Sequence, residues 1–244
     1  MSNGEFVERY DQVILHPLTR EQYGNSGFYN VGRWSASTPS AATACTALVA
    51  DHIERAELDA PGLDVVDVGC GLGDTTAQIA AACRPDAKIV GVNISQAQVA
   101  EAQGRHPGLN FRVMDATKLE FDAASVDRIL SVEAVFHFDP RTAFLDAACR
   151  VLRPGGRMVI TDVLFTADST PWEWWVPDVN RSVTLDGYAS LCAQAGFKVE
   201  SVADVTAVTW TPFCAHLRDT GRNEAADRIE KWVSNYLLAV LTVP

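Results

Sequence analysis

The 244-residue sequence predicts an α/β protein built on a doubly wound, mostly parallel sheet. The stretch 63–68 is apolar and rich in β-branched residues without alternation, which is typical of a strand covered on both faces. A glycine-rich turn, a helical pattern over 74–82 and a second strand over 87–93 follow it. Two strands joined by a helix in this way must lie parallel in the sheet.

The turn between the first strand and its helix carries Gly69, Gly71 and Gly73 at alternate positions. Glycine lacks Cβ, so the backbone can bend sharply here and approach a ligand closely. The spacing is not the dinucleotide pattern, because Asp74 and Thr76 stand where its last glycine would be. The turn therefore indicates either a polar ligand at the start of the helix or glycines that serve only packing.

The composition bounds the class of protein. A chain of this length with 48% hydrophobic residues suits one domain, or one domain with a small cap. A net charge of −11 argues against a nucleic-acid partner, and the absence of a long apolar run argues against a membrane segment. The six cysteines form no C-x-x-C pair, so we expect reduced thiols, a cytoplasmic protein and no metal site.

The segment before the first strand predicts helices and an ordered loop. Apolar spacing predicts a short helix over 5–15 that Pro17 ends, and the loop 23–34 is rich in glycine and aromatic residues. A longer helix is expected to start near Pro39 and to run through 41–55.

Further strands are expected along the rest of the chain. They are predicted over 109–114, 126–132, 157–163 and 197–205, and the helices between them over 140–150 and 185–195. From residue 211 the pattern is helical, most clearly over 228–233. The segment 236–243 could continue a helix or form a last strand.

Three motifs stand in a fixed order between residues 63 and 163. They are Asp67-x-Gly-x-Gly-x-Gly73, the pair Asp115-Ala116 after the third strand, and the turn Arg150-Val-Leu-Arg-Pro-Gly-Gly-Arg157. Together they resemble the class I S-adenosylmethionine-dependent methyltransferases. The resemblance implies one Rossmann-like domain over 1–244 with seven strands, the last antiparallel. It also implies a helical lid over 1–58, a cofactor-binding core over 63–163 and an acceptor-side cap over 164–184.

The resemblance implies S-adenosylmethionine as cofactor and S-adenosylhomocysteine as its product. The implied cofactor-binding residues are Asp67, Gly69, Gly71, Gly73, Asn93, Ser95, Gln98, Asp115, Ala116 and Ser131. Asn93 stands where the family commonly has an acidic residue for the ribose, so a weaker contact is expected there. Ser95 and Asp115 could instead serve only as the N-cap or turn residues of the segments that follow them.

The catalytic hypothesis concerns His137 and Asp162. The stretch Glu133-Ala-Val-Phe-His137 resembles bacterial methyltransferases that act on antibiotic sugars and macrolides, and sterol methyltransferases share related motifs. The resemblance implies that His137 takes a proton from an acceptor hydroxyl while Asp162 orients the imidazole. A structural loop histidine is the alternative.

Aromatic residues are the expected acceptor contacts. In the family, the N-terminal region and the segment after the fifth strand face the substrate. This implies Tyr23, Tyr29, Glu133, Trp172, Trp174 and Trp175 as substrate-binding residues, with Tyr10 as a further lid contact. The aromatic residues could equally cap the core or fill an interface, and Glu133 could touch the cofactor instead.

The sequence thus predicts O-methylation of a small molecule such as a secondary metabolite. N- or C-methylation stays open, and so does a protein that binds S-adenosylmethionine without methylating, as a cyclase-like or regulatory protein would. The acceptor is not identified, and a homodimer is neither indicated nor excluded.

Overall fold

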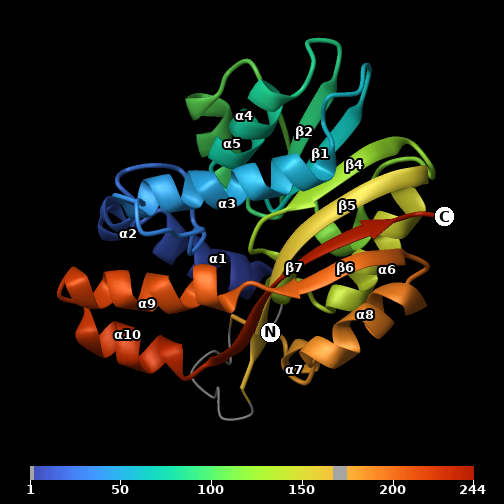
Figure 1. The fold of residues 1–244 in the computed structure, drawn as a ribbon. Helices are drawn as coiled ribbons and strands as arrows, with labels where there is room; N and C mark the ends of the chain where they lie inside the picture. The colour runs from blue at the N-terminus through green and yellow to red at the C-terminus, as the bar shows by residue number, and fades with distance from the viewer. Residues whose placement is uncertain (1–2, 167–174) are drawn as a thin grey trace.

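The computed structural model describes residues 3–166 and 175–244. Seven strands among these residues form a single sheet in the order β3-β2-β1-β4-β5-β7-β6 (Figure 1). The strands are β1 (Asp64–Val68), β2 (Lys88–Asn93), β3 (Asn110–Val113), β4 (Val126–Ser131), β5 (Leu152–Phe165), β6 (Lys198–Asp204) and β7 (Val233–Thr242). The predicted α/β class and its mostly parallel sheet are confirmed.

The helices described around the sheet include short 3₁₀ turns. The α-helices are α1 (Asn3–Ile14), α2 (Pro17–Gln22), α3 (Ala41–Ala56), α4 (Asp74–Ala82), α5 (Gln96–Arg105), α6 (Arg141–Val151), α7 (Asp178–Arg181), α8 (Leu185–Gln194), α9 (Trp210–Asp219) and α10 (Asn223–Glu230). The 3₁₀ turns used below are η1 (Ala116–Lys118) and η2 (Val135–His137).

The last strand, which the sequence left open, is present. β7 pairs antiparallel with both β5 and β6, from Arg157 opposite Thr242 to Phe165 opposite Val233. The helical pattern over 228–233 is therefore interrupted, because α10 ends at Glu230 and β7 begins at Val233. This pairing also extends β5 beyond the predicted 157–163.

Two prolines act differently from the prediction. Pro17 begins α2 rather than only ending the helix before it, since proline at the first helical position loses no hydrogen bond. The side chain of His16 caps that helix by accepting from Leu18 N. Pro39 lies outside α3, whose N-cap is Ser40.

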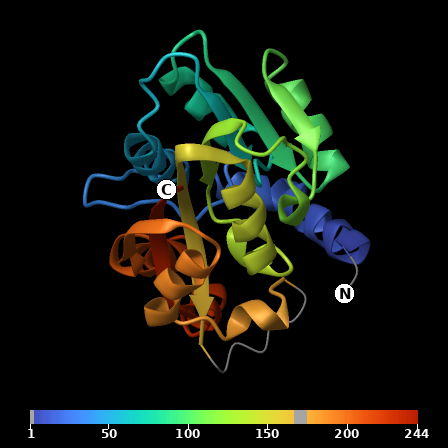
Figure 2. The same cartoon turned by 90° about the vertical axis from the view of Figure 1, so that its right-hand side faces the viewer.

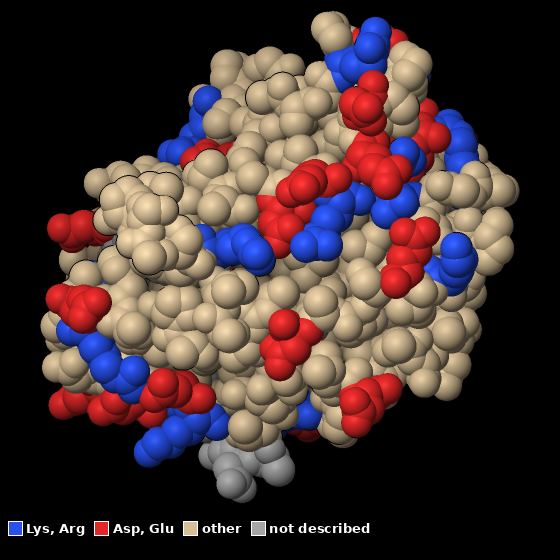
Figure 3. All heavy atoms as spheres, in the orientation of Figure 1, with Lys and Arg blue, Asp and Glu red and all other residues tan. Residues whose placement is uncertain are grey.

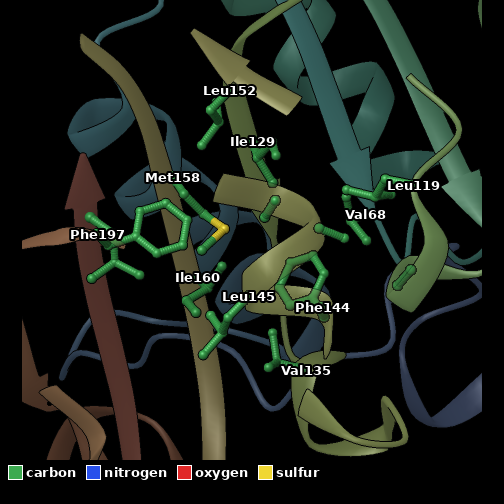
Figure 4. Packing of buried hydrophobic residues seen from close by; sticks show 14 of the residues in the cluster. Val68, Leu119, Ile129, Val135, Phe144, Leu145, Leu152, Met158, Ile160 and Phe197 are labelled. Carbon is green, nitrogen blue, oxygen red and sulfur yellow. The ribbon is translucent and has the colours of Figure 1, made fainter. Parts of the chain in front are cut away.

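Neighbouring residues of the central strand β1 pack into two hydrophobic cores, one on each face of the sheet. Val66 and Val68 of β1 pack with the α6 and α8 side, whereas Val65 packs with Ile79 of α4 on the other face. Figure 4 shows the first of these cores, with Phe144 of α6 among its side chains. Helices on both faces leave ligands access only at the sheet edge.

The N-terminal region before β1 has two structurally different parts. α3 packs on α4, β4 and β5 and places Ala56 in the core on that face. Only the part before it contributes side chains to the cavity described below, and Figure 2 shows this blue segment running beside the green part of the chain. α3 therefore belongs to the helical layer of the sheet, and the helical lid expected over 1–58 stays a prediction.

Charged residues on the surface are largely paired. Arg153 lies 3.0 Å from Asp64 and 2.6 Å from Asp127, and Arg157 binds both Glu57 and Glu200. On the face shown in Figure 3, Lys and Arg lie among Asp and Glu and form no continuous basic area. No helix of the described residues has the length and apolar character needed to cross a membrane.

His52 in α3 is a buried histidine held neutral by its surroundings. Its Nδ1 lies 2.8 Å from the Leu48 carbonyl and so donates to it, while Nε2 has no partner among the described residues. Burial lowers the pKa of His52 from 6.5 to about 4. Between these pH values the unfolded chain takes up a proton that the folded chain does not, so acid destabilises the fold.

We expect the free energy of unfolding to lose about 3 kcal/mol through His52 as the pH falls from 6.5 to 4. His52→Asn keeps a donor for the Leu48 carbonyl and should remove this part of the acid sensitivity. Denaturant unfolding at several pH values, compared with His16→Asn at an exposed position, measures it. Equal acid sensitivity of wild type and His52→Asn would contradict the assignment.

Candidate active site

A cavity of about 410 Å³ lies where β1, β2, β3 and β4 end. This volume is within the ~300–1,000 Å³ range of small-molecule sites. Gly69, Asp115 and His137 line it from the segments that follow β1, β3 and β4, and Asn93 lines it as the last residue of β2. Side chains of α1 and residues 175–179 line its other side. The carboxyl edge of the sheet therefore gathers residues that the sequence separates by as much as 170 positions.

The glycine turn exposes backbone to this cavity. Gly69 has φ +80°, and a Cβ there would lie 2.5 Å from that of Ala134. Gly71 has φ +53°, and a Cβ there would meet no atom within 4 Å. Since both glycines line the cavity, their backbone can approach a bound molecule without a side chain between.

Three of the predicted cofactor residues support the cavity from behind instead of lining it. Asp67 accepts from Thr76 Oγ1 at 2.6 Å, and Ser131 Oγ donates to the Val68 carbonyl at 2.8 Å. Gly73, with φ +90°, is the N-cap of α4 and leaves room for the ring of Phe111. In this structure the three residues have structural roles, and their contact with the cofactor stays a prediction. Burial raises the pKa of Asp67 to about 7.

The residues that follow β2 do line the cavity and bind one another. Asn93 Nδ2 donates to Gln98 Oε1 at 3.0 Å, and Asn93 Oδ1 accepts from Ser95 N at 2.9 Å. Ser95 Oγ also accepts from Gln98 N, so its N-cap role, raised as an alternative, is confirmed alongside its place in the cavity wall.

Asp11 of α1 is a member of this group that the sequence analysis missed. Its carboxylate accepts from Ser95 Oγ at 2.8 Å and from Gln98 Nε2 at 2.7 Å. Both bonds join residues more than 80 positions apart. The only available signal was an acidic residue within the predicted N-terminal helix, which is too common to single out.

Asp115 and Ala116 line the cavity after β3. Asp115 Oδ1 accepts from Thr117 N at 2.9 Å and from Thr117 Oγ1 at 2.7 Å, and this caps η1. The turn role raised as an alternative is therefore present. Because a carboxylate has further acceptor sites, it does not prevent Asp115 from binding a ligand.

His137 and Asp162 do not form the expected pair. His137 Nδ1 lies 2.7 Å from the carbonyl of Trp175. Asp162 lies on the side of α6 and α8, where it is 3.2 Å from Arg141 Nε and accepts from Tyr188 OH at 2.8 Å. The expectation that Asp162 orients His137 is corrected, because the bonds of Asp162 lie within the fully buried core.

The bond to Trp175 determines the tautomer of His137. A carbonyl oxygen only accepts, so Nδ1 carries the proton and Nε2 of the neutral ring is unprotonated. Burial lowers the pKa of His137 to about 4, and the ring is therefore neutral at pH 7. The turn that carries it is held by Asn180, whose Nδ2 donates to the carbonyls of Phe136 and Phe138.

Glu133 combines a strained backbone with a buried carboxylate. Its φ is +55°, and its Oε2 accepts from Val31 N and from Tyr236 OH, each at 2.7 Å. Desolvation raises the pKa of Glu133 to about 7 although both bonds lower it. Glu133 lines the cavity and links the loop after α2 to β7.

Aromatic rings surround His137. The ring of Tyr10 lies 5.0 Å from that of His137 and 5.4 Å from that of Trp175, and Phe6 lies 5.5 Å from His137. Tyr29 lines the cavity and donates to the Ile14 carbonyl at 2.6 Å.

The other predicted aromatic contacts have different outcomes. Tyr23 does not line the cavity. It packs against the buried cluster around Val31 and Trp210, as the core-packing alternative expects, and its contact with a substrate stays a prediction. Trp172 and Trp174 lie outside the described residues.

Known proteins share this arrangement. Residues 66–160 match the model of a methyltransferase domain. The chain is 34% identical over 197 residues to O-methyltransferase cnsE of Penicillium expansum. This match covers 73% of this chain and 68% of that protein. It is 30% identical over 238 residues to the erythromycin 3''-O-methyltransferase of Saccharopolyspora erythraea. This match covers 88% of this chain and 76% of that protein.

The chain is a class I S-adenosylmethionine-dependent methyltransferase. Among solved structures, the [4+2]-cyclase SpnF has the same fold, with a TM-score of 0.79 at 22% identity over 98% of this chain and 96% of that one. The strand order and the antiparallel β7 agree with this family.

The cavity suits the methyl donor of this family. The methyltransferase offers open backbone at Gly69 and Gly71, amide groups at Asn93 and Gln98, and a carboxylate at Asp115. These groups can hold a nucleoside and an amino-acid moiety through hydrogen bonds. No group of three or more His, Cys, Asp or Glu that could hold a metal ion occurs among residues 3–166 and 175–244.

Gly71→Ala should weaken S-adenosylhomocysteine binding by roughly tenfold, because its Cβ would enter the open space beside the turn. Gly62→Ala is the matched control, since Gly62 has φ +66° with no atom within 4 Å of a Cβ and lies outside the cavity lining. Both variants should lose similar stability, of about 1 kcal/mol. Calorimetric titration and unfolding curves measure the two effects, and equal affinity in both variants would contradict close approach at Gly71.

Proposed function

We propose that this enzyme methylates a hydroxyl of a small natural-product molecule, with His137 as the general base. The observation that carries the proposal is the unprotonated Nε2 of His137, a consequence of the Nδ1–H bond to the Trp175 carbonyl. His137 lines the same cavity as the glycine turn, so donor and acceptor can share one space. The names of relatives such as the erythromycin 3''-O-methyltransferase support a natural-product alcohol.

Bound S-adenosylmethionine supplies a methyl group on a sulfonium, so the driving force of the displacement resides in the cofactor. The residues of this chain hold the acceptor and receive its proton. His137 accepts the proton at Nε2, and the Trp175 carbonyl stabilises the resulting imidazolium by keeping the Nδ1–H bond. The aromatic rings of Phe6 and Tyr10 exclude water from this proton transfer.

Asp162 has a supporting role in this proposal. Arg141 is paired with Asp162. Its Nη1 donates to the Asn180 carbonyl, and its backbone N–H donates to Asn180 Oδ1. Asn180 in turn holds the two carbonyls that flank His137. Asp162 therefore acts through Arg141 and Asn180 on the position of the base, at a distance from the reacting proton.

The test is incubation with S-adenosylmethionine carrying a labelled methyl group and a panel of hydroxylated macrolides, glycosides and phenols. Label recovered in an ether of one panel member supports the proposal. Label on carbon or nitrogen would replace O-transfer by C- or N-transfer. Donor binding without any labelled product would favour a non-methylating protein.

His137→Asn should lower turnover by roughly 10²-fold or more and leave S-adenosylhomocysteine affinity nearly unchanged. Asparagine keeps a donor for the Trp175 carbonyl but lacks Nε2, so the variant removes the base alone. The kcat/KM of the wild type should fall only as the pH approaches 4, because the pKa of His137 is lowered to about 4. Rates of methyl transfer to the acceptor identified in the panel test both points. Near-full turnover of the His137→Asn variant would remove His137 from the mechanism.

Glu133 should favour the cationic donor over its neutral product at high pH. Its pKa is raised to about 7, so its carboxylate is ionised above that pH and protonated below it. The affinity ratio of S-adenosylmethionine to S-adenosylhomocysteine should rise roughly tenfold between pH 6 and pH 8, and Glu133→Gln should abolish the rise. Titrations of both ligands measure the ratio. A ratio that does not change with pH in the wild type would mean that Glu133 does not face the sulfonium.

A further inference from the structure

The part of the cavity around His137 is bounded by rings and apolar side chains. Phe6, Val7 and Tyr10 line it from α1, and Trp175, Val176 and Val179 line it from the opposite segment. Tyr10 contacts the rings of both His137 and Trp175. A molecule beside the base therefore meets surface that favours apolar groups.

The charges on the cavity wall all have one sign. The ionisable acidic residues among its described lining are Asp115, Glu133, Asp139 and Asp178, and the described lining contains no Lys or Arg. The segment 167–174, outside the described residues, contains Asp168 and Glu173 but no Lys or Arg in its sequence. It cannot add a cationic side chain to the wall.

The arginines near the cavity are paired with acidic residues. Arg105 binds Asp74 at 2.9 Å, and Arg20 binds Glu101 at 3.0 Å. The buried Arg141 is paired with Asp162, and Arg181 lies 3.2 Å from Asp178. Lys118 lies 3.7 Å from Asp115 at an exposed position. Neither this lysine nor any of the four arginines is part of the described cavity lining.

This charge pattern disfavours an anionic acceptor. A carboxylate or phosphate that leaves water needs a cationic or multiple hydrogen-bonding partner. In this cavity it would meet carboxylates instead, and like charges repel more strongly where water is scarce. A neutral molecule suffers no such penalty, and it gains from contact with the aromatic wall.

We propose that the acceptor is a largely apolar alcohol without an anionic group, and that the acidic wall excludes carboxylated and phosphorylated analogues. The proposal rests on the proposed function, since it identifies the class of molecule that faces His137. Its physical basis is the combination of an aromatic wall with carboxylates and without a cationic side chain.

The experiment uses three probes with one ring system and different charge. They are 2-naphthalenemethanol, 2-naphthoate and 2-naphthalenemethylamine, titrated at pH 7.5 into protein saturated with S-adenosylhomocysteine. We expect the alcohol to bind at least ~10-fold more tightly than the carboxylate. The ammonium should also bind more tightly than the carboxylate, because the carboxylates of the wall attract a cation. Equal or tighter binding of the carboxylate overturns the proposal. Binding of the ammonium no tighter than that of the carboxylate, or no binding of the alcohol at millimolar concentration, overturns it as well.

Two charge-reversal variants test whether the selection against an anion arises at the cavity wall. Asp139→Lys adds a cation to the cavity wall and should raise naphthoate affinity several-fold with little change for the alcohol. Asp59→Lys makes the same change at an exposed turn before β1, at the opposite end of that strand, and should leave the ratio unchanged. An identical effect of both variants on the naphthoate-to-alcohol ratio would contradict selection by the cavity wall.

Failure of this proposal can be distinguished from failure of the proposed function. If S-adenosylhomocysteine does not bind, the methyltransferase function proposed for this cavity fails before any probe is added. If it binds and naphthoate binds as well as the alcohol, only the inference about acceptor charge fails. Unfolding curves of the two lysine variants confirm that a lost affinity is not a lost fold.

Discussion

The site depends on β1, a strand that is buried on both faces of the sheet. The turn that follows β1 must leave the carboxyl end of the sheet open to a ligand. Val65 and Val66 of β1 pack into opposite cores, so helices cover both faces and a ligand can enter only where the strands end. The glycine turn keeps that edge open, because Gly69 and Gly71 adopt positive φ and carry no side chain. Thr76 supports the turn from below through its bond to Asp67.

Buried polar groups connect this edge to the rest of the fold. Asp162 and Arg141 form a pair inside the core, and a buried charge of this kind is costly to leave without its partner. Asn180 extends the network to the turn that carries His137. The position of His137 thus depends on α6, α7 and β5 together, which explains how this histidine can be held in one orientation.

The N-terminal helix participates in the site through hydrogen bonds as well as through its aromatic side chains. Asp11 accepts hydrogen bonds from Ser95 and from Gln98. Both residues lie near Asn93, and at the position of Asn93 the family commonly has an acidic residue. A carboxylate is therefore present beside the end of β2, but it comes from α1. These two hydrogen bonds fix α1 to the end of β2 in this structure.

The sequence by itself determined what is local. A run of β-branched residues, glycines at alternate positions and the N-cap of α5 depend on neighbouring residues, and the class of fold and the glycine turn followed from them. The positions Asn93, Ser95 and Gln98 were implied by the family resemblance, and they line the cavity. Even the bounds of α4 agree with the prediction over 74–82.

Only the tertiary structure decided which distant side chains meet. The direction in which Asp162 leaves β5 depends on strand register and on the position of α6 and α8, which no pattern along the chain records. The same holds for Asp11, for Tyr23 and for the Trp175 carbonyl, a backbone group that has no signature in the sequence. Local chemistry sets the elements of this methyltransferase, whereas its hydrogen-bond partners arise from packing between residues far apart in the chain.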